Sequence, residues 1–229
     1  MENLADSIKK YNRGLGLNTR LPKGVSVLNP FKDNERVFPW SDAFYDMFYA
    51  DKQPRSLILG INPGRLGAGQ TGIPFTDTKR LFEYVGLGSS DNLTHEASSA
   101  FIYRMMDAYG GAASFFSEFL ISSVCPLGFV VKKNGKMVNY NYYDSPSLFK
   151  AVTPFIVEKM NEQLKWPINR SVVYCLGTGK NLQFLNELNN TYQWFERIEA
   201  LEHPRFIMQY KSREVEAYID KYLRVLQQV

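Results

Sequence analysis

The sequence predicts an α/β fold, a three-layer sandwich in which a central, mainly parallel four-stranded sheet is flanked by helices. Short apolar segments alternate with longer segments of helical spacing, which is typical of βαβ units with right-handed connections. Glycine- or proline-containing turns follow several of the apolar segments. The chain has 229 residues, of which 45% are hydrophobic, so we expect a sizeable core in a single domain over residues 1–229.

In the first half of the chain the expected elements are, in order, a helix over 3–12, a loop over 20–38, a helix over 41–49, a strand over 56–61, a helix ending near 84 and a helix over 96–109. Prolines and a glycine favour the loop, and aromatic residues at helical spacing favour the second helix. Thr76 or Asp77 is expected to cap the third helix, and Gly86 to follow its end.

In the second half we expect a strand over 119–124, a hairpin over 130–143, a helix from 146 to about 164, a strand over 171–176, a helix over 181–188, a strand over 194–200 and a final helix ending near 227. The Asn-Gly pair at 134–135 predicts the hairpin turn. Ser145 and Pro146 suit the cap and first position of their helix. Thr178 and Ser212 are expected to cap the last two helices.

Bulk composition restricts the class of protein only loosely. The net charge of +4 is compatible with a polyanionic partner but does not require one. Cys125 and Cys175 stand in apolar segments and are expected to be buried free thiols, too few for a four-cysteine iron–sulfur cluster. We find no signal pattern and no apolar run long enough for a membrane span, so we expect a cytoplasmic protein.

The most informative stretch is the run from Gly60 to Phe75, which contains five glycines and two prolines and follows the first predicted strand. Such a backbone path lets the main chain approach a ligand closely. Ligands bind at the carboxyl ends of parallel strands. We therefore expect the loops at 62–75, 123–128, 177–179 and 201–210 to share one edge of the sheet. That edge would gather Asn62, Phe75, Ser123 and His203 around one cleft.

This run resembles motif 1 of the single-strand-selective monofunctional uracil-DNA glycosylases, a branch of the uracil-DNA glycosylase superfamily. That family has Gly-Met-Asn-Pro-Gly, then Gly, then Gln-Thr-Gly-Val-Pro-Phe at the same spacing. The ungapped match comprises Gly60, Asn62, Pro63, Gly64, Gly67, Gln70, Thr71, Gly72, Pro74 and Phe75. Cys125-Pro126-Leu127 and His203-Pro204-Arg205 follow in the family's order. The chain is most similar to a bacterial second branch, because its middle and last motifs depart from the animal-type pattern.

The resemblance implies a uracil-DNA glycosylase-like fold and catalytic roles for Asn62 and His203. An amide does not ionise near neutral pH, so Asn62 would orient the attacking water rather than remove its proton. His203 would donate a hydrogen bond to the O2 atom of the departing base and stabilise its negative charge. The alternatives are an asparagine that ties down a turn and a structural histidine before a proline.

The same resemblance places further residues around the base. Phe75 would stack on the flipped base, against the alternative of a core phenylalanine. Ile61, Gly64 and Ala68 are expected to contact the substrate, with backbone groups of this loop helping to recognise uracil. Ser123 stands where animal-type members have an asparagine that reads the pyrimidine edge. A hydroxyl can rotate to donate or accept, so we expect either a wider range of bases, including xanthine, or weaker activity.

Arg205, Gln209 and Lys211 are the expected DNA-binding residues. The family's His-Pro-Ser-Pro-Arg is shortened to His-Pro-Arg here, so a solvated basic loop is an equal alternative to a DNA wedge. The cluster of Lys132, Lys133 and Lys136 would ordinarily be a solvated face beside a hairpin turn.

We therefore expect a monomeric, monofunctional glycosylase that removes uracil or a related deaminated base from DNA and leaves an abasic site. We expect it to need no metal and no cofactor. One alternative is a catalytically silent nucleic-acid or nucleobase-binding module of the same fold. Another is an α/β enzyme that acts on a free nucleoside or nucleotide.

Overall fold

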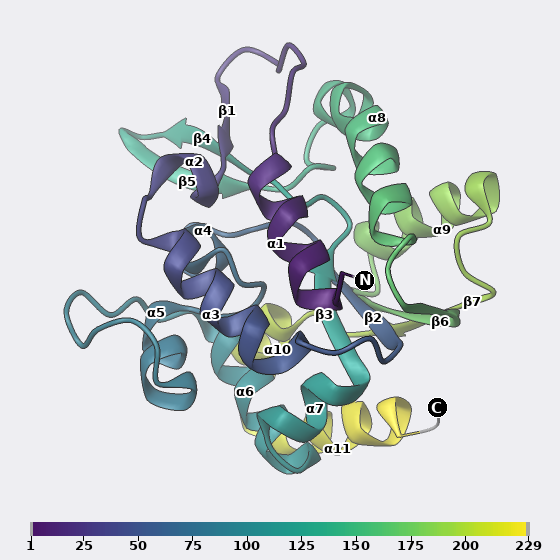
Figure 1. The fold of residues 1–229 in the computed structure, drawn as a ribbon. Helices are drawn as coiled ribbons and strands as arrows, with labels where there is room; N and C mark the ends of the chain where they lie inside the picture. Colours follow the sequence, from purple (N-terminus) through teal and green to yellow (C-terminus); the bar gives the residue numbers. More distant parts are fainter. Residues whose placement is uncertain (1, 228–229) are drawn as a thin grey trace.

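The alternation of strands and helices is confirmed by the computed structural model of the chain, which describes residues 2–227 (Figure 1). In chain order the elements are α1 (Leu4–Gly14), β1 (Val25–Leu28), α2 (Pro30–Asp33), α3 (Val37–Tyr49), β2 (Arg55–Gly60), α4 (Ala68–Thr71), α5 (Thr78–Arg80), the π-helical turn η1 (Leu81–Val85), α6 (Ala97–Tyr109), α7 (Ala112–Glu118), β3 (Phe119–Ser123), β4 (Gly128–Lys133), β5 (Lys136–Tyr140), α8 (Pro146–Gln163), β6 (Ile168–Leu176), α9 (Lys180–Tyr192), β7 (Arg197–Leu201), α10 (Pro204–Tyr210), the 3-10 turn η2 (Ser212–Glu214) and α11 (Val215–Leu226).

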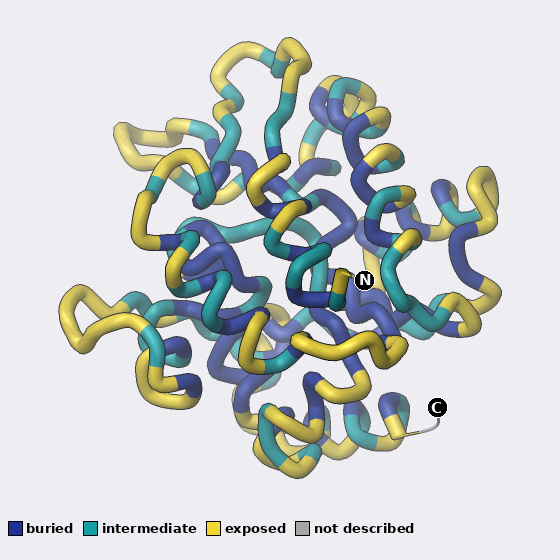
Figure 2. The backbone as a smooth tube through the Cα atoms, viewed as in Figure 1, coloured by how far each residue is buried: buried dark blue, intermediate teal, exposed yellow. Residues whose placement is uncertain are grey.

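The larger sheet has four strands in the order β3-β2-β6-β7, and every neighbouring pair is parallel. All six residues of β2 are buried, as a central strand with helices on both faces requires. From β2 the chain steps one way to β3, and from β3 it steps the other way to β6 and β7. Right-handed connections therefore place α6 on one face and α8 and α9 on the other. Figure 2 shows the buried strands at the centre of the molecule.

A second, three-stranded antiparallel sheet has the order β1-β4-β5. Its β4–β5 hairpin confirms the turn expected at residues 134–135. The expectation of a loop throughout 20–38 was wrong, because this segment contains β1 and α2. Val25 and Val27 alternate along β1 and pack against the core, a pattern that a search for long apolar strands overlooks. The predicted fold class thus holds for the larger sheet, and the smaller sheet is an addition to it.

Several predicted helix ends are confirmed and others are corrected. Asp77 caps α5 by accepting a hydrogen bond from the Arg80 N–H, and Gly86 follows η1 in the left-handed conformation. Ser145 caps α8 as predicted. Thr178 does not cap α9, because the capping position is Gly179 and no side chain bonds there. Ser212 was also a wrong cap, since it begins the turn η2 ahead of α11.

The two thiols are buried, as expected. Cys125 and Cys175 are buried and unpaired with each other, and burial raises the pKa of each thiol to about 12. Within residues 2–227, no helix has both the length and the apolar character needed to cross a bilayer.

Candidate active site

A cavity of about 280 Å³ lies at the carboxyl edge of the larger sheet, lined by residues at or after the ends of β2, β3 and β7. The expected loop 177–179, after β6, does not line it. The cavity brings together the predicted residues that follow three different strands, namely Ile61, Asn62, Gly64, Ala68, Phe75, Ser123, His203, Arg205 and Gln209. Lys211 is the one predicted residue outside it. Its ammonium group lies 2.9 Å from Glu214 Oε1, at the far end of α10.

The glycine-rich loop, residues 60–75, is shaped around the ring of Phe75. A Cβ atom on Gly60 would lie 2.7 Å from Phe75 Cε2, so only glycine lets the ring rest across the end of β2. Phe75 itself has φ = 53°, a left-handed conformation that costs roughly 1–3 kcal/mol for a residue other than glycine. The centres of the Phe75 and His203 rings are 5.7 Å apart. The loop therefore holds an aromatic wall beside the predicted catalytic histidine.

Other matched residues hold this loop rather than face the cavity. The Gln70 amide donates to the Arg65 carbonyl at 2.9 Å. The buried Thr71 hydroxyl accepts from the Ile73 N–H at 3.1 Å and donates to the Thr76 carbonyl at 2.6 Å. These hydrogen bonds hold the path of the loop, so the matched residues that do not face the cavity help to position those that do.

Asn62 lies where the two sheets meet. Its Oδ1 accepts a hydrogen bond from the Tyr142 N–H at 3.1 Å, which fixes the orientation of the amide. Its Nδ2 makes longer contacts with the carbonyls of Pro63, at 3.3 Å, and Tyr140, at 3.5 Å. The strand β2 thus positions the backbone of Asn62, while the chain leaving β5 sets the direction of its side chain.

Tyr142 is anchored in turn by a buried network. Its hydroxyl donates to Asn181 Oδ1 at 2.9 Å, and Asn181 Nδ2 donates to the Leu176 carbonyl, the last residue of β6, at 3.1 Å. Both side chains are buried. The orientation of Asn62 is therefore tied to the end of the neighbouring parallel strand through two other residues.

His203 follows β7 and caps α10. Its Nδ1 accepts a hydrogen bond from the Arg205 N–H at 3.1 Å, so the neutral ring carries its proton on Nε2. Burial, with the nearby charge of Arg205, lowers the pKa of His203 to about 4. The ring is consequently neutral near pH 7 and retains one N–H donor that the backbone does not use.

Ser123 ends β3 directly beside Gly60. It is 7% exposed and lines the cavity. Its hydroxyl forms no hydrogen bond with any residue between 2 and 227, whereas the preceding Ser122 hydroxyl donates to Gln163 Oε1 on the other side of the sheet, at 2.7 Å. Alternation along the strand therefore leaves the Ser123 hydroxyl free to bind a ligand.

The structure adds residues that sequence reasoning missed, chiefly Glu96 and Asn139. Glu96 precedes α6, and its carboxylate lies so close to the glycine loop that a Cβ atom on Gly67 would be 2.0 Å from Glu96 Oε2. Burial, followed by the charge of Asp77, raises the pKa of Glu96. Asn139 of β5 accepts from the Arg65 N–H at 3.0 Å. Neither residue lies in a matched motif, so only the fold could reveal them.

The segment 201–210 was expected to be a loop, but Pro204–Tyr210 forms the helix α10. Proline at its first position and the His203 cap favour this start. Arg205, Phe206, Gln209 and Tyr210 all line the rim of the cavity. Phe206 and Tyr210 are 42% and 66% exposed, and their ring centres are 5.6 Å apart. The rim therefore carries one cation and two exposed aromatic rings.

Comparison with known proteins identifies the family. A scan of protein families matches residues 47–227 to the Uracil DNA glycosylase superfamily. The chain belongs to this superfamily. A solved structure described as the crystal structure of wild-type Pedobacter heparinus SMUG2 aligns with a TM-score of 0.97 over 100% of this chain and 98% of that chain, at 50% sequence identity. No match was found among curated proteins.

The predicted activity is thereby confirmed at the level of the family. This glycosylase is a monofunctional hydrolase of the N-glycosidic bond of uracil in DNA, and DNA is its partner. Neither match favours the silent binding module. In the described part of the chain, no group of three histidine, cysteine or acidic side chains is placed to hold a metal ion.

Proposed function

We propose that the glycosylase takes a flipped uracil, or a related deaminated base, into the cavity beside Phe75, with Asn62 and His203 as catalytic residues. The observation that carries this proposal is the pairing of an oriented amide with a neutral histidine donor in one cavity at the sheet edge. Hydrolysis passes through an oxocarbenium-like sugar and a departing base anion. One group must therefore act on the water and the other on the base.

Asn62 is the group for the water. One lone pair of its Oδ1 is taken by the Tyr142 N–H, so the other accepts a hydrogen bond from the attacking water. The amide orients the water oxygen toward the anomeric carbon of the sugar and does not remove a proton. Holding reactants in this way supplies a large part of a rate enhancement, because the entropy of alignment is lost before the reaction begins.

His203 is the group for the base. Its Nε2–H donates to O2 of the base, where negative charge develops as the bond breaks. Because the pKa of the protonated ring is about 4, the ring is neutral near pH 7, and its Nε2–H stabilises this charge by hydrogen bonding without transferring a proton. Ser123 reads the edge of the base with a rotatable hydroxyl, and backbone groups of Ile61, Gly64 and Ala68 complete the contacts.

The rim of the cavity engages the DNA around the flipped nucleotide. Arg205 contacts a phosphate, and Gln209 lies one helical turn further along α10 on the same rim. The exposed rings of Phe206 and Tyr210 offer surfaces on which a base can stack. Lys211 contributes only to the general attraction of DNA, since Glu214 accompanies it. We expect the enzyme to act as a single-domain monomer in the cytoplasm.

A panel of oligonucleotides tests the substrate. Single- and double-stranded DNA carrying uracil, hypoxanthine, xanthine or hydroxymethyluracil is incubated with enzyme and then treated with alkali, which cleaves at abasic sites. We expect cleavage after alkali only, with uracil among the substrates. Cleavage of a free nucleoside, together with no competition by DNA, would instead support an enzyme of nucleoside metabolism.

A further inference from the structure

The β4–β5 hairpin projects from the body of the protein (Figures 1 and 2). Its strands pair without interruption from Phe129↔Tyr140 to Lys133↔Lys136. The connecting residues Asn134 and Gly135 have φ values of 49° and 77°, as in the two-residue turns that match the twist of antiparallel strands. The hairpin is therefore a defined extension of the sheet rather than a loose loop.

The inner end of this hairpin belongs to the active site. Asn139 lines the cavity, and its side chain accepts a hydrogen bond from the Arg65 N–H in the glycine-rich loop. Side chains alternate between the two faces of a strand, so Met137 shares the face of Asn139. Lys132 is the direct partner of Met137 across the hairpin and has the same orientation.

The other two lysines of the hairpin belong to the opposite face. Lys133 and Lys136 are direct partners, one residue away from Lys132 and Met137 along their strands. Adjacent residues of a strand point in opposite directions. The hairpin thus separates its cations into Lys132, on the face that continues from the cavity, and Lys133 with Lys136 on the other face.

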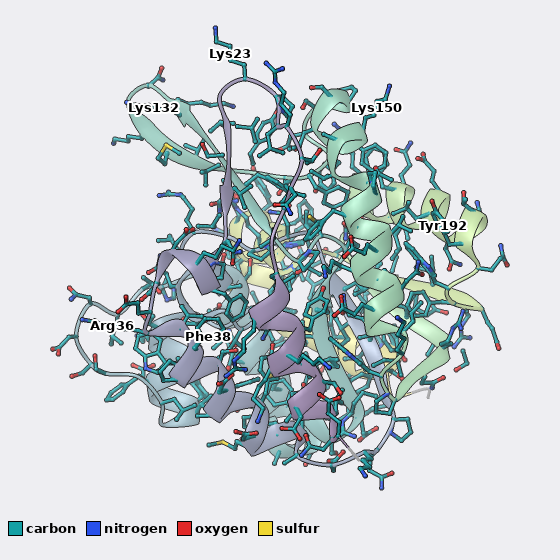
Figure 3. The ribbon with its side chains drawn as sticks, turned by 45° about the horizontal axis from the view of Figure 1, so that its top comes forward. Lys23, Arg36, Phe38, Lys132, Lys150 and Tyr192 are labelled. Atoms are coloured by element: carbon teal, nitrogen blue, oxygen red, sulfur yellow. The ribbon has the colours of Figure 1, made fainter. Side chains whose placement is uncertain are left out.

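Lys132, Lys133 and Lys136 are exposed, and no carboxylate of residues 2–227 forms a salt bridge with any of them. Figure 3 shows Lys132 on the hairpin and Lys23 on a neighbouring loop, both at the periphery. Met137, which pairs with Lys132 across the hairpin, is 39% exposed. The face of the hairpin that carries Asn139 therefore extends outward from the cavity, first to the exposed side chain of Met137 and then to Lys132, which forms no salt bridge within residues 2–227.

We propose that this face, formed by Asn139, Met137 and Lys132, binds the DNA backbone beyond the flipped nucleotide. Met137 lies about 7 Å along the strand from Asn139. The face therefore reaches a phosphate beyond the flipped nucleotide. The proposal rests on the proposed function, because the cavity must hold that base for the distance to have meaning.

Charge and continuity identify the partner as DNA backbone. Lys132 binds a phosphate through its ammonium group, and Met137 packs against the apolar side of a sugar. This face is continuous with the lining of the cavity, so a DNA strand whose base enters the cavity passes over the face. Lys133 and Lys136 do not face this path.

Substrates of different length test the proposal. The short substrate has one nucleotide on each side of the uridine, and the long ones are extended by about six nucleotides on the 5′ side, the 3′ side or both. The variants are Lys132→Glu and, as a matched control on the opposite face, Lys133→Glu. Thermal unfolding verifies that both variants are folded.

We expect Lys132→Glu to lower kcat/KM about tenfold on the substrate extended on both sides and on only one of the two single extensions. The short substrate and the rate at saturation should be unchanged. Lys133→Glu should stay within about twofold of the wild type throughout. Lys132→Ala should also lessen the slope of log Kd against log salt concentration by about 0.7–0.9, the loss of one phosphate contact.

Equal losses for both Glu variants would overturn the proposal, since they would indicate attraction by net charge rather than a defined face. So would a Lys132→Glu loss that is as large on the short substrate as on the long ones. A wild-type protein that excises uracil from no substrate of any length would instead overturn the proposed function itself.

Discussion

The two sheets of this glycosylase are built differently and contribute differently to the site. The parallel sheet β3-β2-β6-β7 has a fully buried central strand, and three of its strand ends deliver Asn62, Ser123 and His203. The antiparallel sheet β1-β4-β5 is largely exposed along β5 and supplies no predicted catalytic group. Asn62 shows that a reacting side chain carried by one sheet can be oriented by the chain that leaves the other.

Asn62 shows this division most clearly. Its backbone follows β2, but its amide oxygen is held by the Tyr142 N–H just beyond β5. Substitutions at the parallel strand ends should therefore remove the chemistry itself. Substitutions on the antiparallel side should instead weaken the orientation of Asn62, or the binding of DNA beyond the flipped nucleotide.

The largest effect is expected for Asn62→Ala. Loss of the amide removes the orientation of the attacking water, so single-turnover excision of uracil should slow by about 10³-fold or more. Binding of a uracil oligonucleotide and thermal stability serve as controls and should change little. A variant that excises at a nearly normal rate would remove Asn62 from the catalytic residues.

A smaller loss is expected for His203→Ala, about 10²-fold in the chemical step, the size typical of one preorganised donor. The rate at saturating enzyme reports that step separately from affinity. A variant that binds DNA weakly but excises normally when saturated would show that His203 serves binding instead.

On the antiparallel side we expect Tyr142→Phe to slow excision about tenfold. The change removes the hydroxyl that donates to Asn181, and the backbone N–H that holds Asn62 then becomes less well fixed. Tyr11→Phe is the matched control, because its buried hydroxyl accepts a bond from Gln163 away from the cavity. Equal slowing by both variants would mean a loss of general stability rather than of alignment.

The pH dependence of stability sharpens the assignment of His203. Its pKa of about 4 in the folded state lies below the ordinary 6.5, so protonation favours the unfolded chain. Its contribution is complete above pH 6.5 and is lost as the pH falls toward 4. Relative to His203→Ala, the wild type should therefore lose about 2 kcal/mol of unfolding free energy between pH 7 and 4.5, measured by urea titration. A constant difference would contradict a ring that is neutral in the folded state near pH 7.

The smallest effect concerns Ser123, whose hydroxyl is free in the cavity. Ser123→Asn should shift the ratio of uracil to xanthine excision severalfold toward uracil, since a fixed amide leaves buried groups unpaired against the wrong edge. The rates of both proteins on both bases decide the matter. An unchanged ratio would place Ser123 away from the base edge.

The parallel sheet and the residues at its carboxyl edge could be predicted from the sequence, because long apolar strands and an ungapped motif mark them directly. The strand β1 could not be predicted, because its short alternating pattern lies in a segment whose prolines favour a loop. The helix α10 was also missed, because it begins within a motif that we expected to form a loop. Glu96 and Asn139 were missed for a different reason. Each reaches the cavity from outside every motif, and only the packing of α6 and β5 on the glycine-rich loop brings them there.

Combining Asn62→Ala with Tyr142→Phe shows whether the two sheets act on one group. Single-turnover uracil excision is measured for the wild type, both single variants and the double variant. If Tyr142 works through Asn62, the double variant should be as slow as Asn62→Ala alone, because no amide remains to be oriented. A double variant slower by the full product of the two single effects would contradict the claim and show that Tyr142 acts independently of Asn62.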